Sequence, residues 1–515
     1  MVSNYNAIDL FCGAGGFSKG FEEAGFNIIA SYDIVAKFKE TYNKNHKKPV
    51  YTIFDLSKGI PENIKDIKID VIIGSPPCQG FSDARGCRVP KNEEEFKRNS
   101  LPLDFIKIVE YAKPKIALME NVSGMQTFTL GEIKFIDLVI NKFKEIGYNV
   151  TYNLLNSANF GVPQQRHRVF ILAIDKEFKI KPILPSYDLN NRFIDNKDFN
   201  TVYDAIGDLP KEPSGDGISE YALELSKCSE YQKLMRSKNK VNKIFNHKII
   251  NKPTNEELEI ICRLPKGKIY RSSRFGDRYI GVWELYKDVL KDDERELLHF
   301  LCRKRTNNEF KEEKGKYKEG YIREDKFPVN KDGKFYWPEK YPKNAINQNR
   351  SPKEILMSLL SNNWIRKKVY IKNGIKYNAY DINTKSGIRP MYMRLTQKLP
   401  SRTILTTSFR VRELVHPTEN RPLTLREGAR IQSFPDDFIF PKNNQDTAVM
   451  IGNAVPPLMG YELAKYIKII LNYIEDNSNT EYFKIISHFK QKNGKKSDIK
   501  VQKNTLLKYL RIKGA

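Results

Sequence analysis

Short apolar runs alternate with amphipathic, helix-like segments along the first 175 residues of the chain. The apolar runs have the length of strands and cover residues 7–11, 27–31, 70–73, 116–119 and 169–174. The helical patterns between them cover residues 18–24, 35–45, 104–112 and 133–146. Alternation on this scale predicts an α/β fold, with a doubly wound and mostly parallel sheet that carries helices on both faces.

The pattern changes between about residue 176 and residue 400, where Lys, Asn, Tyr and Pro are frequent and periodicity is weak. This texture predicts a second, irregular α+β domain. Within it, residues 352–360 look helical, and residues 364–371 and 375–380 look like strands joined by an Asn-Gly turn at Asn373 and Gly374. A helix followed by a hairpin is the outline of a winged helix.

Sequence dense in motifs returns after Thr403, and a helix is expected over residues 459–473. Residues 476–515 are rich in lysine and predict a solvated basic tail. No basic-then-apolar leader and no uncharged run of about 18 apolar residues occurs, so we expect a soluble, cytoplasmic protein.

The charge balance of the chain indicates the kind of partner it binds. Lys and Arg number 88 against 62 Asp and Glu, a formal net charge of +26. This excess favours a polyanion, with nucleic acid first, although base bias in a genome also enriches Lys and Asn. The six cysteines include no CxxC pair, which argues against a zinc knuckle or a disulfide framework.

Residues 74–82, GSPPCQGFS, directly follow the apolar run at 70–73. Cys78 therefore lies on a loop at the carboxyl end of an expected strand, where open α/β sheets bind their ligands. Pro76 and Pro77 restrict this loop, which suits the presentation of a nucleophile. On this segment alone, a buried structural cysteine is the alternative.

A glycine-rich turn, Cys12-Gly13-Ala14-Gly15-Gly16-Phe17-Ser18, separates the first expected strand from the first expected helix. Glycines here let a nucleotide-like cofactor lie against the backbone. The dinucleotide fingerprint GxGxxG is met only in part, because Ser18 stands at the third glycine position.

Two pairs of an acidic and an apolar residue follow the next strands. Asp33 and Ile34 end the second strand, and Asp55 and Leu56 follow a third. An acid at the end of the second strand is placed to hold a ribose. Together with the glycine turn, these pairs describe a site for an adenosine.

In their order along the chain, these motifs and four later ones resemble the cytosine-5 DNA methyltransferases of bacterial restriction-modification systems. The later motifs are MENV at 119–122, QQRHRVF at 164–170, RPLTLREGARIQSFPDDF at 421–438 and IGNAVPP at 451–457. The resemblance covers about residues 5–175 and 390–475. It implies a Rossmann-like methyltransferase sheet, S-adenosylmethionine as methyl donor, double-stranded DNA as substrate, no metal, and a target-recognition domain in the residues between.

The resemblance also implies roles for residues at matching positions. Cys78 would add to carbon 6 of the target cytosine, Glu120 would be an acid near ring nitrogen 3, and Arg168 would complete the active site with support from Arg166. On a strand, the two arginines would share one face. The residues expected to bind the donor are Phe11, Gly13, Gly15, Gly16, Phe17, Asp33, Ile34, Asp55, Leu56, Pro76, Leu101, Asn453 and Val455.

The implied organisation is a catalytic and cofactor-binding domain over residues 1–175, completed by residues 445–475, and a target-recognition domain with hinge over residues 176–444. The implied activity is methylation of carbon 5 of a flipped-out cytosine in a specific DNA sequence, by a nucleoid-associated monomer that protects host DNA from a cognate endonuclease. Three alternatives are an RNA cytosine-5 methyltransferase of the same fold, a silent DNA-binding protein and an NAD-dependent dehydrogenase. The long middle region argues against the first, and the catalytic motifs argue against the others.

Overall fold

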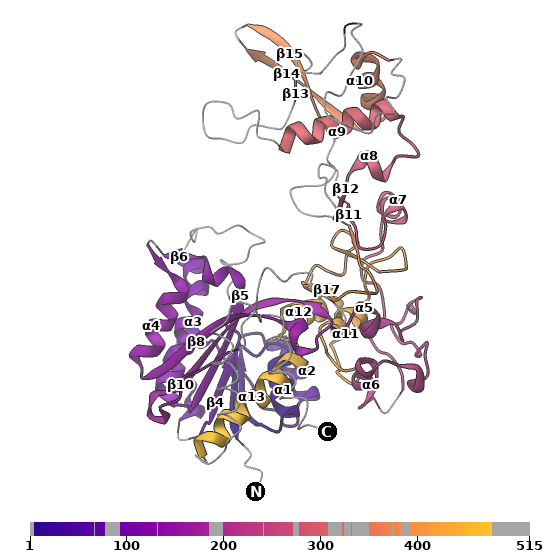
Figure 1. Cartoon of the computed structure of the whole chain (residues 1–515). Helices are drawn as coiled ribbons and strands as arrows, with labels where there is room; N and C mark the ends of the chain where they lie inside the picture. Colours follow the sequence, from indigo (N-terminus) through magenta and orange to yellow (C-terminus); the bar gives the residue numbers. More distant parts are fainter. Residues whose placement is uncertain are drawn as a thin grey trace, which may run out of the picture. The chain divides into compact units, whose positions relative to one another are not determined.

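The computed structural model describes residues 5–65, 67–77, 93–130, 132–184, 199–239, 242–270, 278–306, 322–323, 331, 350–372, 374–382 and 392–475 (Figure 1). The chain divides into two compact units. Unit 1 comprises Met1–Ile250, Gln397–Ser408 and Thr424–Ala515, and unit 2 comprises Asn251–Thr396 and Phe409–Leu423. The assignment of residues 176–444 to target recognition stays a prediction.

A seven-stranded sheet forms the centre of unit 1. Its strand order is β3-β2-β1-β4-β5-β10-β8, and the pairs from β3 to β5 are parallel, whereas β10 is antiparallel to both β5 and β8. The mostly parallel α/β sheet predicted from the sequence is confirmed. The strands are β1 (Asn6–Leu10), β2 (Asn27–Asp33), β3 (Tyr51–Ile53), β4 (Val71–Gly74), β5 (Ile116–Val122), β8 (Tyr148–Asn156) and β10 (His167–Asp175).

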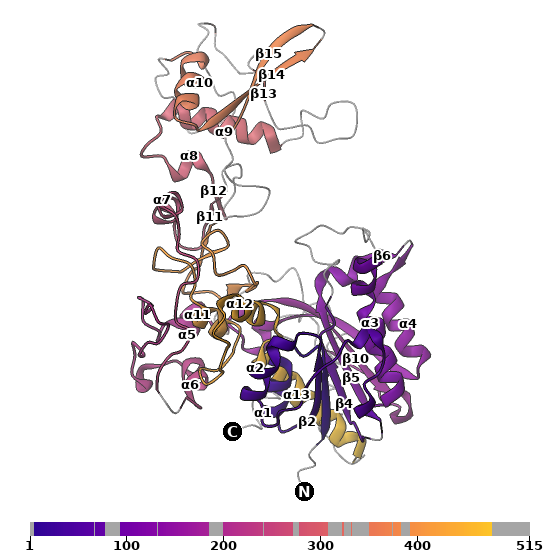
Figure 2. The same ribbon diagram turned by 180° about the vertical axis from the view of Figure 1, so that it is seen from behind.

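Helices cover both faces of this sheet, as Figures 1 and 2 show from opposite sides. On one face, α3 (Glu93–Ala112) and α4 (Phe135–Glu145) share a core with strand residues such as Ile8. On the other face, α1 (Gly16–Glu23) and α13 (Pro457–Glu475) share a core with strand residues such as Ala7. Neighbouring strand residues thus enter opposite cores because side chains alternate along a strand.

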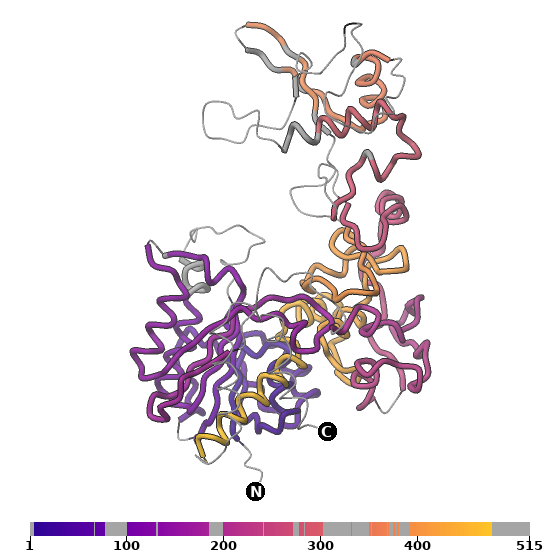
Figure 3. The backbone as a smooth tube through the Cα atoms, in the orientation of Figure 1, coloured from indigo at the N-terminus to yellow at the C-terminus, as the bar shows by residue number. Residues whose placement is uncertain are grey.

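Helices α1 and α13, the first and the last α-helix in the described part of the chain, are in direct contact, and Figure 3 shows the yellow segment beside the indigo one. A Cβ on Gly20 would lie 2.4 Å from the backbone nitrogen of Tyr461 and 2.5 Å from the carbonyl oxygen of Pro457. Only glycine allows backbones to approach this closely. Two segments that lie far apart in the sequence therefore build one layer of the unit.

Unit 1 also contains shorter elements. They are α2 (Lys39–Asn45), β6 (Thr129–Leu130), β7 (Ile133–Lys134), β9 (Gln164–Gln165), α5 (Val202–Ile206), α6 (Glu230–Arg236), β17 (Ser401–Arg402), α11 (Leu425–Ile431) and α12 (Asn444–Asn453). Strand β17 pairs with β9. This pairing joins a late segment of the chain to the residues just before β10.

Unit 2 has a core of its own, built from its helices and short strands. Its elements are α7 (Asn255–Arg263), β11 (Ile269–Tyr270), β12 (Tyr279–Ile280), α8 (Val282–Leu285), α9 (Asp292–Thr306), β13 (Ile322–Arg323), α10 (Pro352–Ser361), β14 (Ile365–Lys372), β15 (Ile375–Ile382), β16 (Met393–Arg394) and β18 (Leu414–Val415). The predicted helix and hairpin are confirmed as α10, β14 and β15. The interpretation of these elements as a winged helix stays a prediction.

Helix α10 begins with a capping box, because Ser351 and Glu354 satisfy each other's backbone N–H groups. The two strands of the hairpin pair antiparallel from Ile365 with Ile382 to Lys372 with Ile375. None of the helices in the described part of the chain has the length and apolar character required to span a membrane.

Candidate active site

The carboxyl ends of the parallel strands β1, β2, β4 and β5 meet at one edge of the sheet, and the predicted site residues follow them. Directly after β1, the backbone N–H of Gly13 donates to Asp33 Oδ2 at 2.9 Å. Asp33 ends β2, and its Oδ1 accepts a hydrogen bond from the Val35 N–H at 2.9 Å. Burial raises the pKa of the Asp33 carboxyl, while these hydrogen bonds oppose the shift. Asp33 therefore fixes the glycine turn to the neighbouring strand.

The glycine turn itself uses left-handed backbone conformations. Gly13 has φ +54° and Gly15, which caps α1, has φ +83°, whereas Phe11 adopts φ +59° without the freedom of a glycine. A Cβ on Gly16 would lie 2.3 Å from the carbonyl oxygen of Val455. Val455, far along the chain, thus contacts the glycine turn. Asn453, two residues before it, is the last residue of α12 and is exposed.

The other residues expected to bind the donor lie in different environments. Ile34 is 61 % exposed at the end of β2, which leaves an apolar surface open. Asp55 accepts hydrogen bonds from the N–H of Ser57 at 3.1 Å and its hydroxyl at 2.7 Å. In contrast, Leu56 and Phe17 are buried in the two cores of unit 1. Leu56 and Phe17 would therefore support the residues around a donor site and would not contact the donor through an exposed surface.

The Pro-Pro segment after β4 contacts the end of β5. Asn121 Nδ2 donates to the Pro76 carbonyl oxygen at 3.2 Å, and Pro76 is buried. A Cβ on Gly74 would lie 2.5 Å from the Leu10 carbonyl oxygen, so glycine is required where β4 ends beside β1. The predicted nucleophile Cys78 lies outside the described residues, two positions after Pro76. Leu101, on α3, is half-buried.

Glu120 and Arg168 form an ion pair at the same edge. Arg168 Nε lies 3.2 Å from Glu120 Oε1, and both side chains are largely buried. Arg168 Nη1 also donates to the His167 carbonyl oxygen at 2.8 Å. Strands β5 and β10 are antiparallel neighbours, and this pairing brings the start of β10 beside the end of β5. The structure therefore unites two of the predicted catalytic residues.

Arg166 bonds to other partners than the Glu120–Arg168 pair. The prediction that both arginines lie on one strand is wrong, because β9 ends at Gln165 and β10 begins at His167. The buried Arg166 Nη1 donates to the carbonyl oxygens of Ile404, at 3.2 Å, and Gly452, at 3.1 Å. Burial, followed by the nearby charge of Arg168, lowers the pKa of Arg166 well below its usual range. These contacts indicate a supporting role that joins three segments of unit 1.

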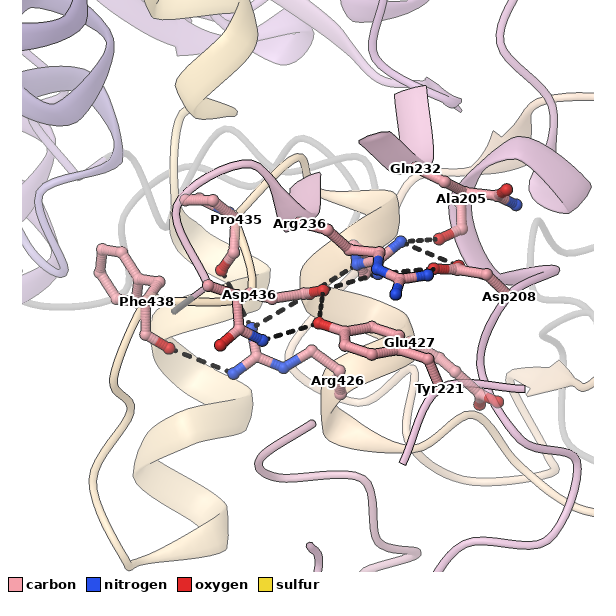
Figure 4. A network of polar contacts seen from close by, with 12 residues as sticks. Ala205, Asp208, Tyr221, Gln232, Arg236, Arg426, Glu427, Pro435, Asp436 and Phe438 are labelled. Atoms are coloured by element: carbon pink, nitrogen blue, oxygen red, sulfur yellow. Dashed lines mark hydrogen bonds and ion pairs between the residues drawn. The ribbon is translucent and has the colours of Figure 1, made fainter. Parts of the chain in front are cut away.

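The segment at 421–438 builds a buried charge network. Arg430 donates to Asp208 and Asp436, and Arg426 donates to the carbonyl oxygen of Phe245. Arg426 also donates to the carbonyl oxygens of Pro435 and Phe438, as Figure 4 shows. Although burial lowers the pKa of Arg430, Asp436 and Asp208 raise it well above its usual range. This network connects α11 with residues near α5 and contributes structure rather than chemistry.

Sequence reasoning missed a second buried polar network, which lies behind the glycine turn. Asp9 Oδ2 accepts hydrogen bonds from the Ser18 hydroxyl at 2.5 Å and from the Ser18 N–H at 3.2 Å. Burial raises the pKa of Asp9 to about 7. The Tyr42 hydroxyl lies 2.9 Å from Ser18 Oγ and 2.6 Å from Ser31 Oγ. A charged residue inside the apolar run at 7–11 was the signal for this network.

Comparisons with known proteins agree with the geometry. A family model described as C-5 cytosine-specific DNA methylase matches residues 5–469. Type II methyltransferase M.AgeI of Thalassovita gelatinovora is 29 % identical over 90 % of this chain and 99 % of its own. Type II methyltransferase M.DdeI of Desulfomicrobium norvegicum is 26 % identical over 92 % of this chain and 91 % of its own.

A solved structure shares the fold. It is described as a DNA modification methyltransferase encoded within a prophage of E. coli, and it matches with a TM-score of 0.55 and 19 % sequence identity. The match covers 91 % of this chain and 100 % of that one.

Proposed function

Because the chain belongs to the C-5 cytosine-specific DNA methylase family and is a DNA (cytosine-5-)-methyltransferase of the restriction-modification type, we propose the course of its reaction. The methyl group comes from S-adenosylmethionine and is transferred to carbon 5 of a cytosine that is flipped out of double-stranded DNA. Cys78 forms a transient covalent bond to carbon 6. The observation that supports this proposal best is the Glu120–Arg168 pair beside the Pro-Pro segment that leads to Cys78.

The chemistry explains why a thiol is required. Carbon 5 of cytosine is a poor nucleophile until another nucleophile adds to carbon 6. A thiolate adds readily and leaves again, so one difficult step becomes several easier ones. When the Cys78 thiolate forms its bond to carbon 6, the electron pair of the 5,6 double bond moves to carbon 5, which takes the methyl group as S-adenosylhomocysteine leaves. A base such as water then accepts the proton from carbon 5, and the electron pair of that C–H bond re-forms the 5,6 double bond as the thiolate leaves.

Glu120 and Arg168 assist the addition. In our proposal Glu120 shares a proton with ring nitrogen 3 and thereby neutralises the charge that the thiolate brings to the ring. Arg168 holds the Glu120 carboxyl by the 3.2 Å contact. In our proposal its guanidinium also donates a hydrogen bond to the flipped cytosine. General acid catalysis of this kind contributes about two to four powers of ten in rate.

The glycine turn has the features of a site for S-adenosylmethionine. A Cβ on Gly13 would meet no heavy atom of the described residues within 4 Å, so among them this side of the turn is open. The turn leads into α1, whose N-terminus favours the carboxylate of an amino acid. Asp33 and the exposed Ile34 suit a ribose and an adenine ring, and Asn453 and Val455 complete the proposed site. The donor supplies an electrophilic methyl group when bound.

Unit 2 is proposed to carry target recognition, within the functional region at 176–444. Flipping a base out of a duplex costs a few kcal/mol, which contacts with DNA have to supply. The exposed side chains Arg366, Lys367 and Lys376 make the hairpin of β14 and β15 a candidate for phosphate contacts. We further propose a monomer that protects host DNA against a partner endonuclease.

Covalent trapping tests the reaction. Duplex DNA with 5-fluorocytosine at the methylated position should form a stable adduct with the wild type in the presence of S-adenosylmethionine, because fluorine prevents the final elimination. Cys78→Ala should form no adduct and transfer no methyl group. The same methyl-transfer assay with transfer RNA in place of duplex DNA tests the alternative of an RNA cytosine-5 methyltransferase. Adduct formation by the Cys78→Ala variant, or no adduct on a verified DNA target, would overturn the proposal.

A further inference from the structure

The glycine turn rests on two side chains that follow β2 in the sequence, Tyr42 and His46. A Cβ on Gly15 would lie 2.2 Å from His46 Nε2 and 2.6 Å from Tyr42 Cε2. A Cβ on Gly13, in the same turn, would meet no heavy atom within 4 Å. Among the described residues, the turn is therefore filled from behind at Gly15 and open at Gly13, where a ligand can lie.

His46 is fixed from two directions. Its Nδ1 lies 3.1 Å from Glu22 Oε2, and the other carboxylate oxygen of Glu22 accepts the Lys47 N–H at 3.1 Å. Its ring stacks on Tyr42 with a centroid distance of 3.9 Å and an interplanar angle of 17°. The His46 side chain has no exposed surface. The imidazole therefore has one defined position beneath the turn.

His46 Nε2 is buried and has no hydrogen-bond partner among the described residues. A buried polar atom without a partner destabilises a protein, and an apolar side chain at this position would avoid that cost. The imidazole nevertheless combines two properties that an apolar side chain lacks. It presents a nitrogen to Glu22 and ends in a flat edge against Gly15. The imidazole therefore fills the space behind Gly15 while it stays bonded to Glu22, which an apolar side chain could not do.

We propose that His46 is a positioning residue for the methyl donor. Its ring, held by Glu22 and Tyr42, supports Gly15 from behind and keeps the turn in the shape that binds the donor. The inference rests on the proposed binding of S-adenosylmethionine at this turn. Since His46 is behind the turn and away from the reacting atoms, its loss should weaken donor binding and leave DNA binding unchanged.

Two substitutions separate the contact with Gly15 from the contact with Glu22. The side-chain amide of His46→Asn can occupy the place of Nδ1 and bond to Glu22, but it ends short of Gly15. The longer His46→Gln reaches the place of Nε2 and loses the Nδ1 contact. Dissociation constants for S-adenosylhomocysteine, by calorimetry, and for duplex DNA, by fluorescence anisotropy, are measured for both, after circular dichroism has shown that they fold.

We expect His46→Asn to weaken S-adenosylhomocysteine binding about tenfold or more, and His46→Gln to remain within about threefold of the wild type. DNA affinity should stay unchanged in both. Glu22→Ala gives an independent route, because it frees the imidazole without changing a residue beneath the turn. It should weaken ligand binding several-fold, and more than His46→Gln does, because Glu22 holds the Lys47 N–H as well as His46 Nδ1. It therefore keeps the proposal testable if His46→Asn folds poorly.

A double-mutant cycle tests the contact itself. Gly15→Ala should weaken S-adenosylhomocysteine binding strongly in the wild type, because its Cβ overlaps His46 Nε2. In the His46→Asn background the same substitution should have a several-fold smaller effect, since that overlap has been removed. The remaining effect reflects Tyr42 and the positive φ of Gly15.

Three results would overturn the positioning role while the wild type binds S-adenosylhomocysteine normally. They are unchanged binding by His46→Asn, weaker binding by His46→Gln than by His46→Asn, and additive effects in the cycle. Failure of the wild type to bind the ligand at all would instead overturn the proposed donor site, and the positioning role with it.

Discussion

Arg168 Nε lies 3.2 Å from Glu120 Oε1, across the antiparallel pair of β10 and β5. Since the proposed acid is held by this guanidinium, Glu120→Gln should lower the rate of methyl transfer by about 10²- to 10⁴-fold. Arg168→Ala should lower it by a similar factor. Single-turnover transfer of a radioactive methyl group to duplex DNA measures the chemical step, and affinity for S-adenosylhomocysteine should be unchanged.

A surface pair provides the control for these variants. Lys142 and Glu145 form an exposed ion pair on α4. Glu145→Gln removes the same charge as Glu120→Gln and should leave the rate unaffected. Equal rates for Glu120→Gln and the wild type would exclude Glu120 from the reaction.

Asp9 gives a prediction for pH. Burial raises the pKa of Asp9 from 3.8 to about 7 in the folded protein. Between these values the folded state keeps a proton that the unfolded state has released, so the free energy of unfolding falls as the pH rises from about 4 to 7. Asp9→Asn should remove up to about 4 kcal/mol of this dependence. Urea unfolding followed by circular dichroism at several pH values measures it, and parallel curves for the two proteins would contradict it.

Arg430 gives a prediction for stability. Arg430→Met removes the guanidinium that bonds both buried carboxylates, those of Asp208 and Asp436. Among the described residues these keep only longer ion pairs, with Arg236 at 3.6 Å and Arg426 at 3.9 Å, so the variant should destabilise unit 1 by about 3–5 kcal/mol. Lys142→Met breaks only an exposed pair and should change stability by less than about 1 kcal/mol. Circular dichroism follows the unfolding of both variants.

The tryptophans add an internal control to that experiment. Trp283, Trp337 and Trp364 all belong to unit 2. If the Arg430 network stabilises unit 1 alone, the tryptophan fluorescence transition should be the same in Arg430→Met and the wild type. A shift of the tryptophan transition by as much as the circular dichroism transition would show that the two units unfold together.

The hairpin of β14 and β15 gives a prediction for DNA binding. Arg366 and Lys367 are exposed on β14, and each phosphate contact they make releases bound counterions. The double variant Arg366→Ala/Lys367→Ala should bind duplex DNA more weakly, with the slope of log K against log salt smaller by about 2. Fluorescence anisotropy between low and moderate salt measures the slope. The control is Lys353→Ala, which changes an exposed lysine on α10. An unchanged slope in the double variant would exclude the hairpin as a phosphate contact.

The alternation of apolar runs predicted most of the central sheet, because its strands are buried on both faces and read as continuous apolar sequence. The edge strand β8 was missed. Its sequence, YNVTYNLLN, carries three asparagines, and most of its residues are only half-buried. Helix α10 and its hairpin could be predicted because the helical pattern at 352–360, the strand-like runs and the Asn-Gly dipeptide between them are local signals.

Contacts between distant segments could not be predicted in the same way. Asp9 was visible as a charge inside an apolar run, but its partner Ser18 and the stacking of His46 on Tyr42 depend on how α1 and α2 pack. The contacts of Arg166 with Ile404 and Gly452 join residues more than 230 positions apart. Only the order of motifs, read as a resemblance, connected such segments before the fold was known.

The contact of α13 with α1 has a consequence for the folding of the chain during its synthesis. During synthesis, the sheet strands and Phe17 leave the ribosome long before Met459 and Leu463, which cover the same apolar face. Unit 2 is made in the interval and has its own core, so it can fold first, although it comes later in the sequence. Of the two helices, only α1 covers this face until α13 is made, so part of the apolar surface of the nascent amino-terminal region stays exposed.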